Sequence, residues 1–277
     1  MLILRMFVVN IYPKNQKINN LKIKSARRGN MLTIYGHRGL PSKAPENTIA
    51  SFKAASEIEG VKWLELDVAI TKDEQLIIIH DDYLDRTTSM SGEMTALNYE
   101  ELKEASAGSW YGAKFKDERL PTFDDVIEIA NEYNMNLNVE LKGVTGANGL
   151  ALSKSMVKQV KEKLANLNQN QEVLISSFNL VLVKLAEEIM PEYKRAVIFH
   201  TTSFKEDWRT LLDYCDAKIV NTEDAKLTKA KVRMVKEAGY ELNVWTVNKP
   251  ARANQLANWG VDGIFTDSAD KMVHLSE

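Results

Sequence analysis

Three acidic residues lie inside short apolar runs of the sequence, where charged side chains are uncommon. Glu65 and Asp67 are separated by one residue within Trp63–Ile70, and Glu140 lies within 137–141. Residues two apart on a strand point to the same face. Carboxylates gathered on one face repel one another unless a cation lies among them, and their oxygens favour a hard divalent ion such as Mg2+ or Ca2+. The spacing therefore predicts a divalent-metal site made by Glu65, Asp67 and Glu140.

Two histidines and two cations also lie at the ends of apolar runs. His37 and His80 each follow such a run. Histidine titrates near neutral pH, so one of the two can accept a proton while the other donates one. Arg38 and Lys142 could neutralise and orient a phosphate, and the arginine could bind it with two hydrogen bonds. The set indicates acid–base chemistry on a phosphorylated substrate.

The remaining histidines and the single cysteine are interpreted as structural. A lone histidine is more often structural than catalytic, and this interpretation applies to His274 and His200. His200 nevertheless follows a predicted strand and could border the site. No motif surrounds Cys215, so a buried apolar role is favoured over a nucleophilic one. A single thiol excludes an internal disulfide and a thiolate metal cluster within one chain.

The composition is typical of a soluble globular protein with a large core. The chain has 277 residues, of which 44% are hydrophobic and 27% are charged. A single α/β barrel typically has about 250 residues, which suits this length. The net charge of -2 does not suggest the concentrated basic face that nucleic-acid binding usually needs. We therefore expect no nucleic-acid partner.

From Met31 onward, short apolar runs alternate with amphipathic stretches. Apolar residues at helical intervals, as at Ile49, Phe52 and Ala55, predict helices, whereas short β-rich runs predict strands. The predicted strands are 33–35, 63–70, 137–141, 173–176, 195–199, 218–220, 242–247 and 263–266, with 76–79 as an extension of the second. The predicted helices are 47–58, 124–133, 150–167, 180–190, 208–214, 226–238 and 251–259.

Strands that alternate with helices predict parallel βαβ units, and eight such units favour a closed (β/α)8 barrel over an open sheet. The alternative, a doubly wound sheet, should have a glycine-rich phosphate turn after its first strand, and Gly36-His37-Arg38-Gly39 is not that turn. Residues 81–121 show no clear βα unit and are predicted to form an insertion beside the barrel mouth, which could act as a lid. The C-terminal ends of barrel strands carry the active site.

The acidic residues also have an ordinary interpretation, in which they face outward into solvent or pair with Lys142. A Glu-x-Asp pair taken alone is usually of that kind. In a barrel strand, however, helices cover the outward face, so outward carboxylates would be buried without partners at a cost of several kcal/mol. We therefore expect Glu65, Asp67 and Glu140 to point into the barrel.

Residues 1–30 differ from the rest and are predicted to lie outside the barrel domain, which spans 31–277. Residues 1–12 are mostly apolar but fall short of the roughly 20 residues of a membrane helix. They also lack the basic start and cleavage pattern of a signal peptide. We expect translation to begin at Met31 and the protein to be cytoplasmic. The alternative is a weak membrane-surface anchor through residues 1–12, apolar first and basic after.

A series of short motifs follows the predicted elements in order. It comprises His37-Arg38-Gly39, Pro45-Glu46-Asn47-Thr48, Phe52, Glu65-x-Asp67, His80-Asp81, Arg86-Thr87-Thr88, Leu120-Pro121-Thr122, Asn138-Val139-Glu140-Leu141-Lys142, Ser176-Ser177-Phe178, Trp245-Thr246-Val247-Asn248 and Asp262-Gly263-Ile264-Phe265-Thr266-Asp267. Each motif would be weak evidence alone, but the ordered series, from Met31 to Asp267, is highly specific. It resembles the signature of the glycerophosphodiester phosphodiesterase family.

The resemblance implies a (β/α)8 barrel with a small insertion after the second strand. The implied reaction is metal-dependent hydrolysis of glycerophosphodiesters to sn-glycerol 3-phosphate and an alcohol. By the same resemblance, Glu65, Asp67 and Glu140 hold one divalent ion, Mg2+ or Ca2+. His37 and His80 act as general acid and general base, and which of them plays which role stays open. Arg38 and Lys142 bind the phosphate.

The resemblance also suggests roles for four residues around this set. Glu46 lies just past the first strand and is expected to assist the site. Asn47 suits the N-cap of the following helix. Phe178 and Trp245 are expected to wall the glycerol side of the site, and the alternative is that they are aromatic residues of the barrel core.

Two rival functions are weighed against this one. The first is a lysophospholipase D or a cyclising phosphodiesterase that acts on lipid-like substrates, which the apolar residues 1–12 mildly favour. The second is a barrel that binds a phosphorylated ligand without catalysis. A purely binding site needs no acid–base pair, so the two histidines disfavour it. The alcohol, the choice between Mg2+ and Ca2+ and the oligomeric state stay open.

Overall fold

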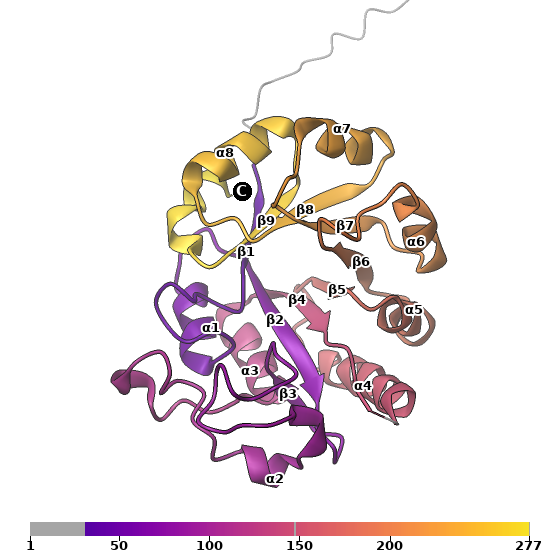
Figure 1. The fold of residues 1–277 in the computed structure, drawn as a ribbon. Coiled ribbons are helices and arrows are strands. Elements are labelled where there is room, and N and C mark those ends of the chain that lie inside the picture. The colour runs from indigo at the N-terminus through magenta and orange to yellow at the C-terminus, as the bar shows by residue number, and fades with distance from the viewer. Residues whose placement is uncertain (1–30, 147, 277) are drawn as a thin grey trace, which may run out of the picture.

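Parallel strands surrounded by helices form a closed barrel in the computed structural model, which describes residues 31–146 and 148–276 (Figure 1). Over these residues the barrel has eight strands, and neighbouring strands pair in parallel. They are β1 (Thr33–Gly36), β2 (Trp63–Ile70), β4 (Asn136–Leu141), β5 (Val173–Ser177), β6 (Lys194–Phe199), β7 (Ile219–Glu223), β8 (Glu241–Trp245) and β9 (Gly263–Thr266). The ring closes because β1 pairs with both β2 and β9. The predicted barrel is confirmed.

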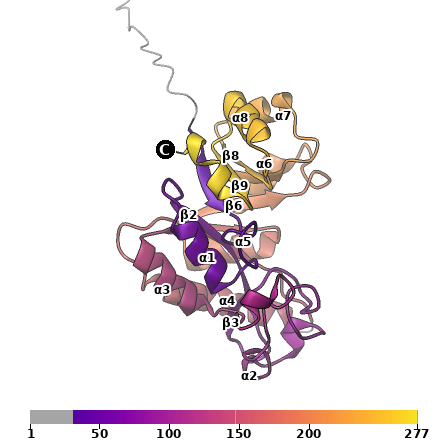
Figure 2. The same ribbon diagram turned by 90° about the vertical axis from the view of Figure 1, so that its left-hand side faces the viewer.

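Helices connect the barrel strands and lie around them, as two perpendicular views show (Figures 1 and 2). They are α1 (Ile49–Ser56), α3 (Phe123–Tyr133), α4 (Gly149–Leu164), α5 (Leu180–Ile189), α6 (Trp208–Tyr214), α7 (Lys229–Glu237) and α8 (Pro250–Trp259). Thr48, Thr122 and Thr228 begin three of them, because each hydroxyl accepts a hydrogen bond from a backbone N–H of the first turn. The ends of the helices differ from the predicted ends by a few residues.

The alternation of side chains along β2 decides which residues reach the barrel interior. Leu64, Leu66 and Val68 belong to the large apolar core that includes the helices. Glu65 and Asp67 lie between them in sequence and therefore point to the opposite face, inside the barrel. Apolar side chains fill another part of the interior, in a cluster of Tyr35, Leu174, Ala196, Ile219 and Phe265.

Residues 76–79 do not extend β2, contrary to the prediction. Leu76–Ile78 form a separate strand, β3, which turns back and pairs antiparallel with the end of β2. The prediction is wrong because an apolar run does not reveal the direction in which a strand pairs. The reversal brings the chain back toward the mouth, where the Ile79 N–H donates to the Asp67 carbonyl at 3.0 Å. His80 follows directly and thus lies beside the acidic residues.

Residues 81–121 form a small insertion beside the barrel, as predicted. It contains the helix α2 (Tyr99–Leu102) and the 3-10 helices η1 (Met94–Ala96) and η2 (Ala113–Phe115). In Figure 1, α2 lies at the lower edge of the molecule, with β3 above it. The Tyr111 hydroxyl donates to the Pro41 carbonyl at 2.9 Å and so connects the insertion to the loop after β1. Its role as a lid stays a prediction.

No helix among the described residues is long and apolar enough to cross a membrane. The start of translation at Met31 and the membrane-surface anchor were both predicted from residues 1–30, which lie outside the described part of the chain.

Candidate active site

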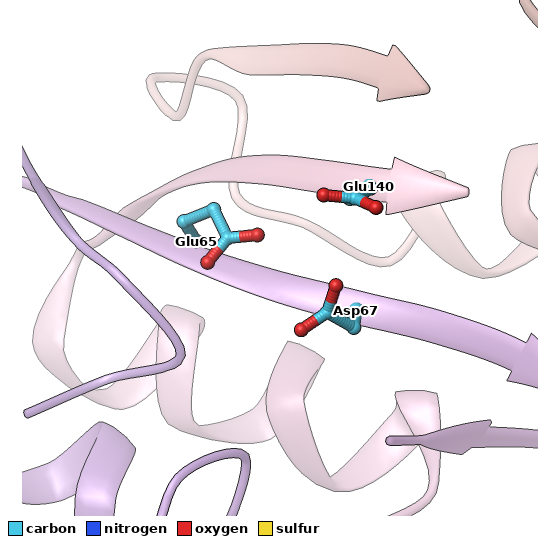
Figure 3. Close-up of side chains that lie close together, drawn as sticks. All are labelled: Glu65, Asp67 and Glu140. Carbon is cyan, nitrogen blue, oxygen red and sulfur yellow. The ribbon is translucent and has the colours of Figure 1, made fainter. Parts of the chain in front are cut away.

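Glu65, Asp67 and Glu140 meet inside the barrel on two neighbouring strands (Figure 3). β2 carries the first two, and the strand register sets Glu140 of β4 directly opposite Asp67. Their exposed fractions are 2%, 1% and 8%, in chain order. One carboxylate oxygen from each lies within 4.8 Å of the others. This is the inward convergence that the sequence predicts.

The surroundings of these carboxylates push their pKa values apart. Burial raises the pKa of Glu65 well above its ordinary value, and the charges of Asp67 and Glu140 raise it further. Burial also acts to raise the pKa of Asp67, but Lys142 and Arg38 outweigh it and lower that pKa. Asp67 Oδ1 is buried and has no hydrogen-bond partner among the described residues. A bound divalent ion would relieve the repulsion and satisfy this oxygen, so the donor set fits a hard cation.

Arg38 and Lys142 contact the carboxylates from the loops after β1 and β4. Arg38 Nη1 lies 2.7 Å from Glu46 Oε1, and its Nε lies 3.3 Å from Asp67 Oδ2. Lys142 Nζ lies 2.7 Å from Glu140 Oε1 and 3.4 Å from Asp67 Oδ1. Burial acts to lower the pKa of each cation, but the carboxylates outweigh it and raise both. Both side chains therefore stay charged at the cavity that they line.

The turn after β1 explains the glycine of the His37-Arg38-Gly39 motif. Arg38 has a φ of 54°, and its backbone N–H donates to Glu65 Oε2 at 2.8 Å. Gly39 follows with a φ of 88°, and a Cβ there would lie 2.6 Å from the carbonyl carbon of Ser51. Only glycine combines this backbone conformation with so close an approach to α1. The turn in this way directs a backbone donor at the acidic cluster.

Asn47 is not the N-cap of α1, contrary to the prediction. Thr48 is the N-cap, and its hydroxyl accepts from the Ser51 N–H. Asn47 has a φ of 56° and donates from Nδ2 to Asp67 Oδ2 at 2.8 Å. The prediction is wrong because two good capping residues are adjacent, and a tertiary contact decides between them. Asn47 instead orients one of the clustered carboxylates.

Asp267 holds the ring of His37. The His37 Nδ1 lies 2.7 Å from Asp267 Oδ1, and because an ionised carboxylate only accepts, Nδ1 carries the hydrogen. Burial acts to raise the pKa of Asp267, but the hydrogen bonds from His37 and Asn248 and the nearby positive charges together outweigh it and lower that pKa. Asn248 Nδ2 donates to the other carboxylate oxygen at 2.6 Å. The Nε2 of His37 is thereby left for proton exchange.

Asp81 holds His80 in the same way, with 2.5 Å between His80 Nδ1 and Asp81 Oδ1. Arg86 donates to both oxygens of Asp81, and these bonds, together with that from His80, lower the pKa of Asp81 to about 2. Arg86 also donates to both oxygens of Glu46 at 2.8 Å. Glu46, which the sequence placed at the site, therefore connects the support of His80 to Arg38.

Four residues that support the histidines stand within the sequence motifs, although the sequence predicts no role for them. They are Asp81, Arg86, Asn248 and Asp267. The first three follow β3 and β8, and the last follows β9 directly. His37 and His80 are predicted to lie at the site because each is a polar residue just past a predicted strand. The same criterion applies to Asp81 and Asp267.

A cavity of about 370 Å³ opens between these groups. Charged and polar residues line one part of it, namely His37, Arg38, Glu65, His80, Asn138, Glu140, Lys142 and Asn221. Phe178, His200 and Trp245 form an aromatic wall, in which the Phe178 ring centre lies 4.5 Å from that of His200 and 5.5 Å from that of Trp245. His200, interpreted as structural, thus borders the site. Trp245 also packs against the interior apolar cluster.

A second cavity of about 670 Å³ adjoins the first. The two share the residues His80, Glu140, Lys142 and Phe178. The second is otherwise lined by residues 81–83, by 141 and 143–145 around the end of β4, and by 177 and 179 at the end of β5. His80 therefore borders both cavities, whereas His37 borders the first.

Comparison with known proteins supports the same assignment. The sequence model of the "Glycerophosphoryl diester phosphodiesterase family" matches residues 37–271. The chain belongs to this family. It is 32% identical to a glycerophosphodiester phosphodiesterase of Caldanaerobacter subterraneus subsp. tengcongensis, over 87% of this chain and 96% of the relative. A glycerophosphodiester phosphodiesterase of Bacillus altitudinis is 31% identical, over 89% and 99%.

A solved structure extends the likeness to three dimensions. The structure of an Oleispira antarctica phosphodiesterase in complex with the product sn-glycerol-3-phosphate matches with a TM-score of 0.82 and 32% identity, over 88% of this chain and 96% of that one. The family, the barrel fold and the enzyme class predicted from the sequence, a glycerophosphodiester phosphodiesterase, are confirmed.

Proposed function

We propose that this phosphodiesterase hydrolyses glycerophosphodiesters to sn-glycerol 3-phosphate and an alcohol with one divalent cation and two histidines. The observation that carries the proposal is the pair of aspartate-held imidazoles, His37 and His80, around one cavity that also contains the acidic cluster. The product bound to the Oleispira antarctica relative supports the substrate class.

Glu65, Asp67 and Glu140 would hold the cation, Mg2+ or Ca2+. When bound, a divalent ion supplies charge neutralisation at the phosphate as the transition state forms. Their mutual closeness, their burial and the unsatisfied Oδ1 of Asp67 support this assignment. Asn47 and the backbone N–H of Arg38 keep two of the carboxylates in position.

Arg38 and Lys142 bind the phosphate between them in this proposal. Both are partly buried cations that line the first cavity. Lys142 pairs with Glu140 and Asp67, and Arg38 pairs with Asp67 as well as with Glu46, so the phosphate would bind next to the ion. Phe178 and Trp245 contact the glycerol part of the substrate. Their aromatic surface excludes water from the neighbouring phosphate.

The positions of the histidines favour His37 as base and His80 as acid. The attacking and leaving oxygens lie on opposite sides of the phosphorus in an in-line displacement. His80 borders both cavities, and the second cavity has room for the leaving alcohol. His80 therefore protonates that alcohol, while His37 takes the proton of the attacking oxygen, which belongs either to water or to a substrate hydroxyl. Both act through Nε2 because each Nδ1 is bound to an aspartate.

The test is release of sn-glycerol 3-phosphate from glycerophosphocholine by the purified protein, with EDTA, Mg2+ or Ca2+. Release that depends on one of the ions is the expected result and identifies that ion. A cyclic phosphate as the final product would support the cyclising alternative, and cleavage of a lysolipid in place of glycerophosphocholine would support a lysophospholipase D. Equal release with EDTA and with either ion would contradict the metal site.

A further inference from the structure

The second cavity lies where the leaving alcohol must go. It meets the first at His80 and Lys142, the residues proposed to protonate the alcohol and to hold the phosphate. The first cavity has the aromatic wall and the smaller volume, about 370 Å³ against about 670 Å³. A diester with its phosphate at Lys142 would thus place glycerol in the first cavity and its other substituent in the second.

The charges around the second cavity are mostly balanced by partners. Glu140 pairs with Lys142 at 2.7 Å, and Asp81 is bound by Arg86 and His80. Asp82 differs, because its carboxylate is exposed and forms no hydrogen bond or ion pair with any described residue. The unbalanced charge at this cavity is therefore negative.

An exposed aromatic ring adjoins that carboxylate in sequence. Tyr83 is 59% exposed and lines the same cavity as Asp82. The segment is fixed at its backbone, since the Met94 N–H donates to the Asp82 carbonyl at 2.9 Å and Tyr83 pairs with Glu93 in a β-bridge. Ammonium groups are attracted both by carboxylates and by the faces of aromatic rings. The Asp82 carboxylate and the Tyr83 ring together would attract a cationic group.

We infer that the second cavity is the subsite for the leaving alcohol and that Asp82 and Tyr83 make it selective for cationic head groups of the choline or ethanolamine type. The inference rests on the proposed function, because it assigns the substrate's leaving group to the cavity beside the proposed acid.

Three substrates isolate the charge of the head group. Glycerophosphocholine and glycerophosphoethanolamine carry a cation, whereas glycerophosphoglycerol does not. The wild-type enzyme should have a kcat/KM about two- to fivefold higher for the cationic pair at low ionic strength, and the ratio should shrink as salt is added. Asp82→Asn should bring the ratio close to one. Tyr83→Phe should keep it, because the ring remains, and Tyr83→Ala should lower it.

Glu59→Gln is the matched control, since it removes one negative charge from the exposed loop between α1 and β2, at the other end of the barrel strands, and should keep the ratio. An unchanged ratio in Asp82→Asn, or a wild-type enzyme that prefers glycerophosphoglycerol, would overturn the inference and leave the proposed function standing. Failure of the wild-type enzyme to cleave any of the three diesters with either ion would instead overturn the proposed function.

Discussion

His37 and His80 are held alike but border different parts of the site. Each has its Nδ1 bound to an aspartate, so each presents Nε2 for proton transfer. His80 lines both cavities, and His37 lines the first. At the scale of single residues, the position of each ring relative to the second cavity is the basis for the proposed assignment of His80 as acid and His37 as base.

Replacing either histidine with alanine should lower kcat for glycerophosphocholine by at least about a hundredfold, because general acid–base catalysis is typically worth that much or more. Glycerophospho-p-nitrophenol, whose leaving group needs little protonation, should restore much of the rate of His80→Ala but not of His37→Ala. Unchanged melting temperatures would show that the fold survives. Recovery by His37→Ala alone would reverse the two roles.

Asp267 is expected to act as a positioning residue through His37. Asp267→Asn should lower kcat at least about tenfold with KM nearly unchanged, because it removes the charged partner that holds the imidazole at Nδ1. The measurement is steady-state kinetics on glycerophosphocholine. Asp213→Asn, which alters a surface contact with Tyr240, is the control. A rise in KM with kcat intact would argue against positioning.

At the scale of elements, β2 and β4 create the acidic cluster through their register. Glu65 and Asp67 share a face of β2, and parallel pairing sets Glu140 opposite Asp67. Hydrogen bonding between the strands thus holds like charges together that would separate in a flexible chain. Without a bound ion, burial and this closeness of like charges together raise the pKa of Glu65.

Glu65→Gln should weaken metal binding and stabilise the metal-free protein by about 1 kcal/mol, which is a few degrees in Tm. A raised pKa means that the folded state holds the Glu65 proton more tightly than the unfolded state does. The carboxylate therefore costs little stability below the ordinary pKa of glutamate and costs more as the pH rises above it.

The difference in Tm between Glu65→Gln and wild type in EDTA should accordingly grow from acid to neutral pH. Added Mg2+ or Ca2+ should raise the Tm of the wild type more than that of the variant. Glu59→Gln is the control for loss of one charge. An equal rise in Tm for wild type and Glu65→Gln would exclude Glu65 as a ligand.

At the scale of the whole molecule, barrel closure gathers loops from distant parts of the chain. His37 follows β1 and is held by Asp267, which follows β9 and is 230 residues away in sequence. The contact forms because β1 and β9 are neighbours in the closed ring. The family match, over residues 37–271, covers the same closed unit.

Removal of residues 1–30 is therefore expected to leave kcat/KM on glycerophosphocholine unchanged within about twofold, because the closed ring and the site lie within residues 33–267. Sedimentation of both forms with anionic vesicles tests the membrane-surface alternative. Binding that only the full chain shows would favour the anchor. The intact mass of the protein from its native host would decide whether Met31 is the start.

The order of elements and the identity of most chemical groups could be predicted from the sequence. Apolar periodicity predicted the barrel strands and helices, because burial on one face or on both leaves a local pattern. The inward direction of Glu65 and Asp67 followed from their alternation with Leu64 and Leu66 in a strand that helices cover. These inferences need only local geometry and the cost of burying charge.

Long-range pairing decided the rest. The reversal of β3, the contact of Asn47 with Asp67 and the support of His37 by Asp267 each join residues whose closeness no local pattern encodes. His200 likewise stacks on Phe178 in the aromatic wall because of the tertiary fold, which its local sequence does not predict. Local periodicity reports which face of an element is buried, but only the closed barrel determines which loops meet at its mouth.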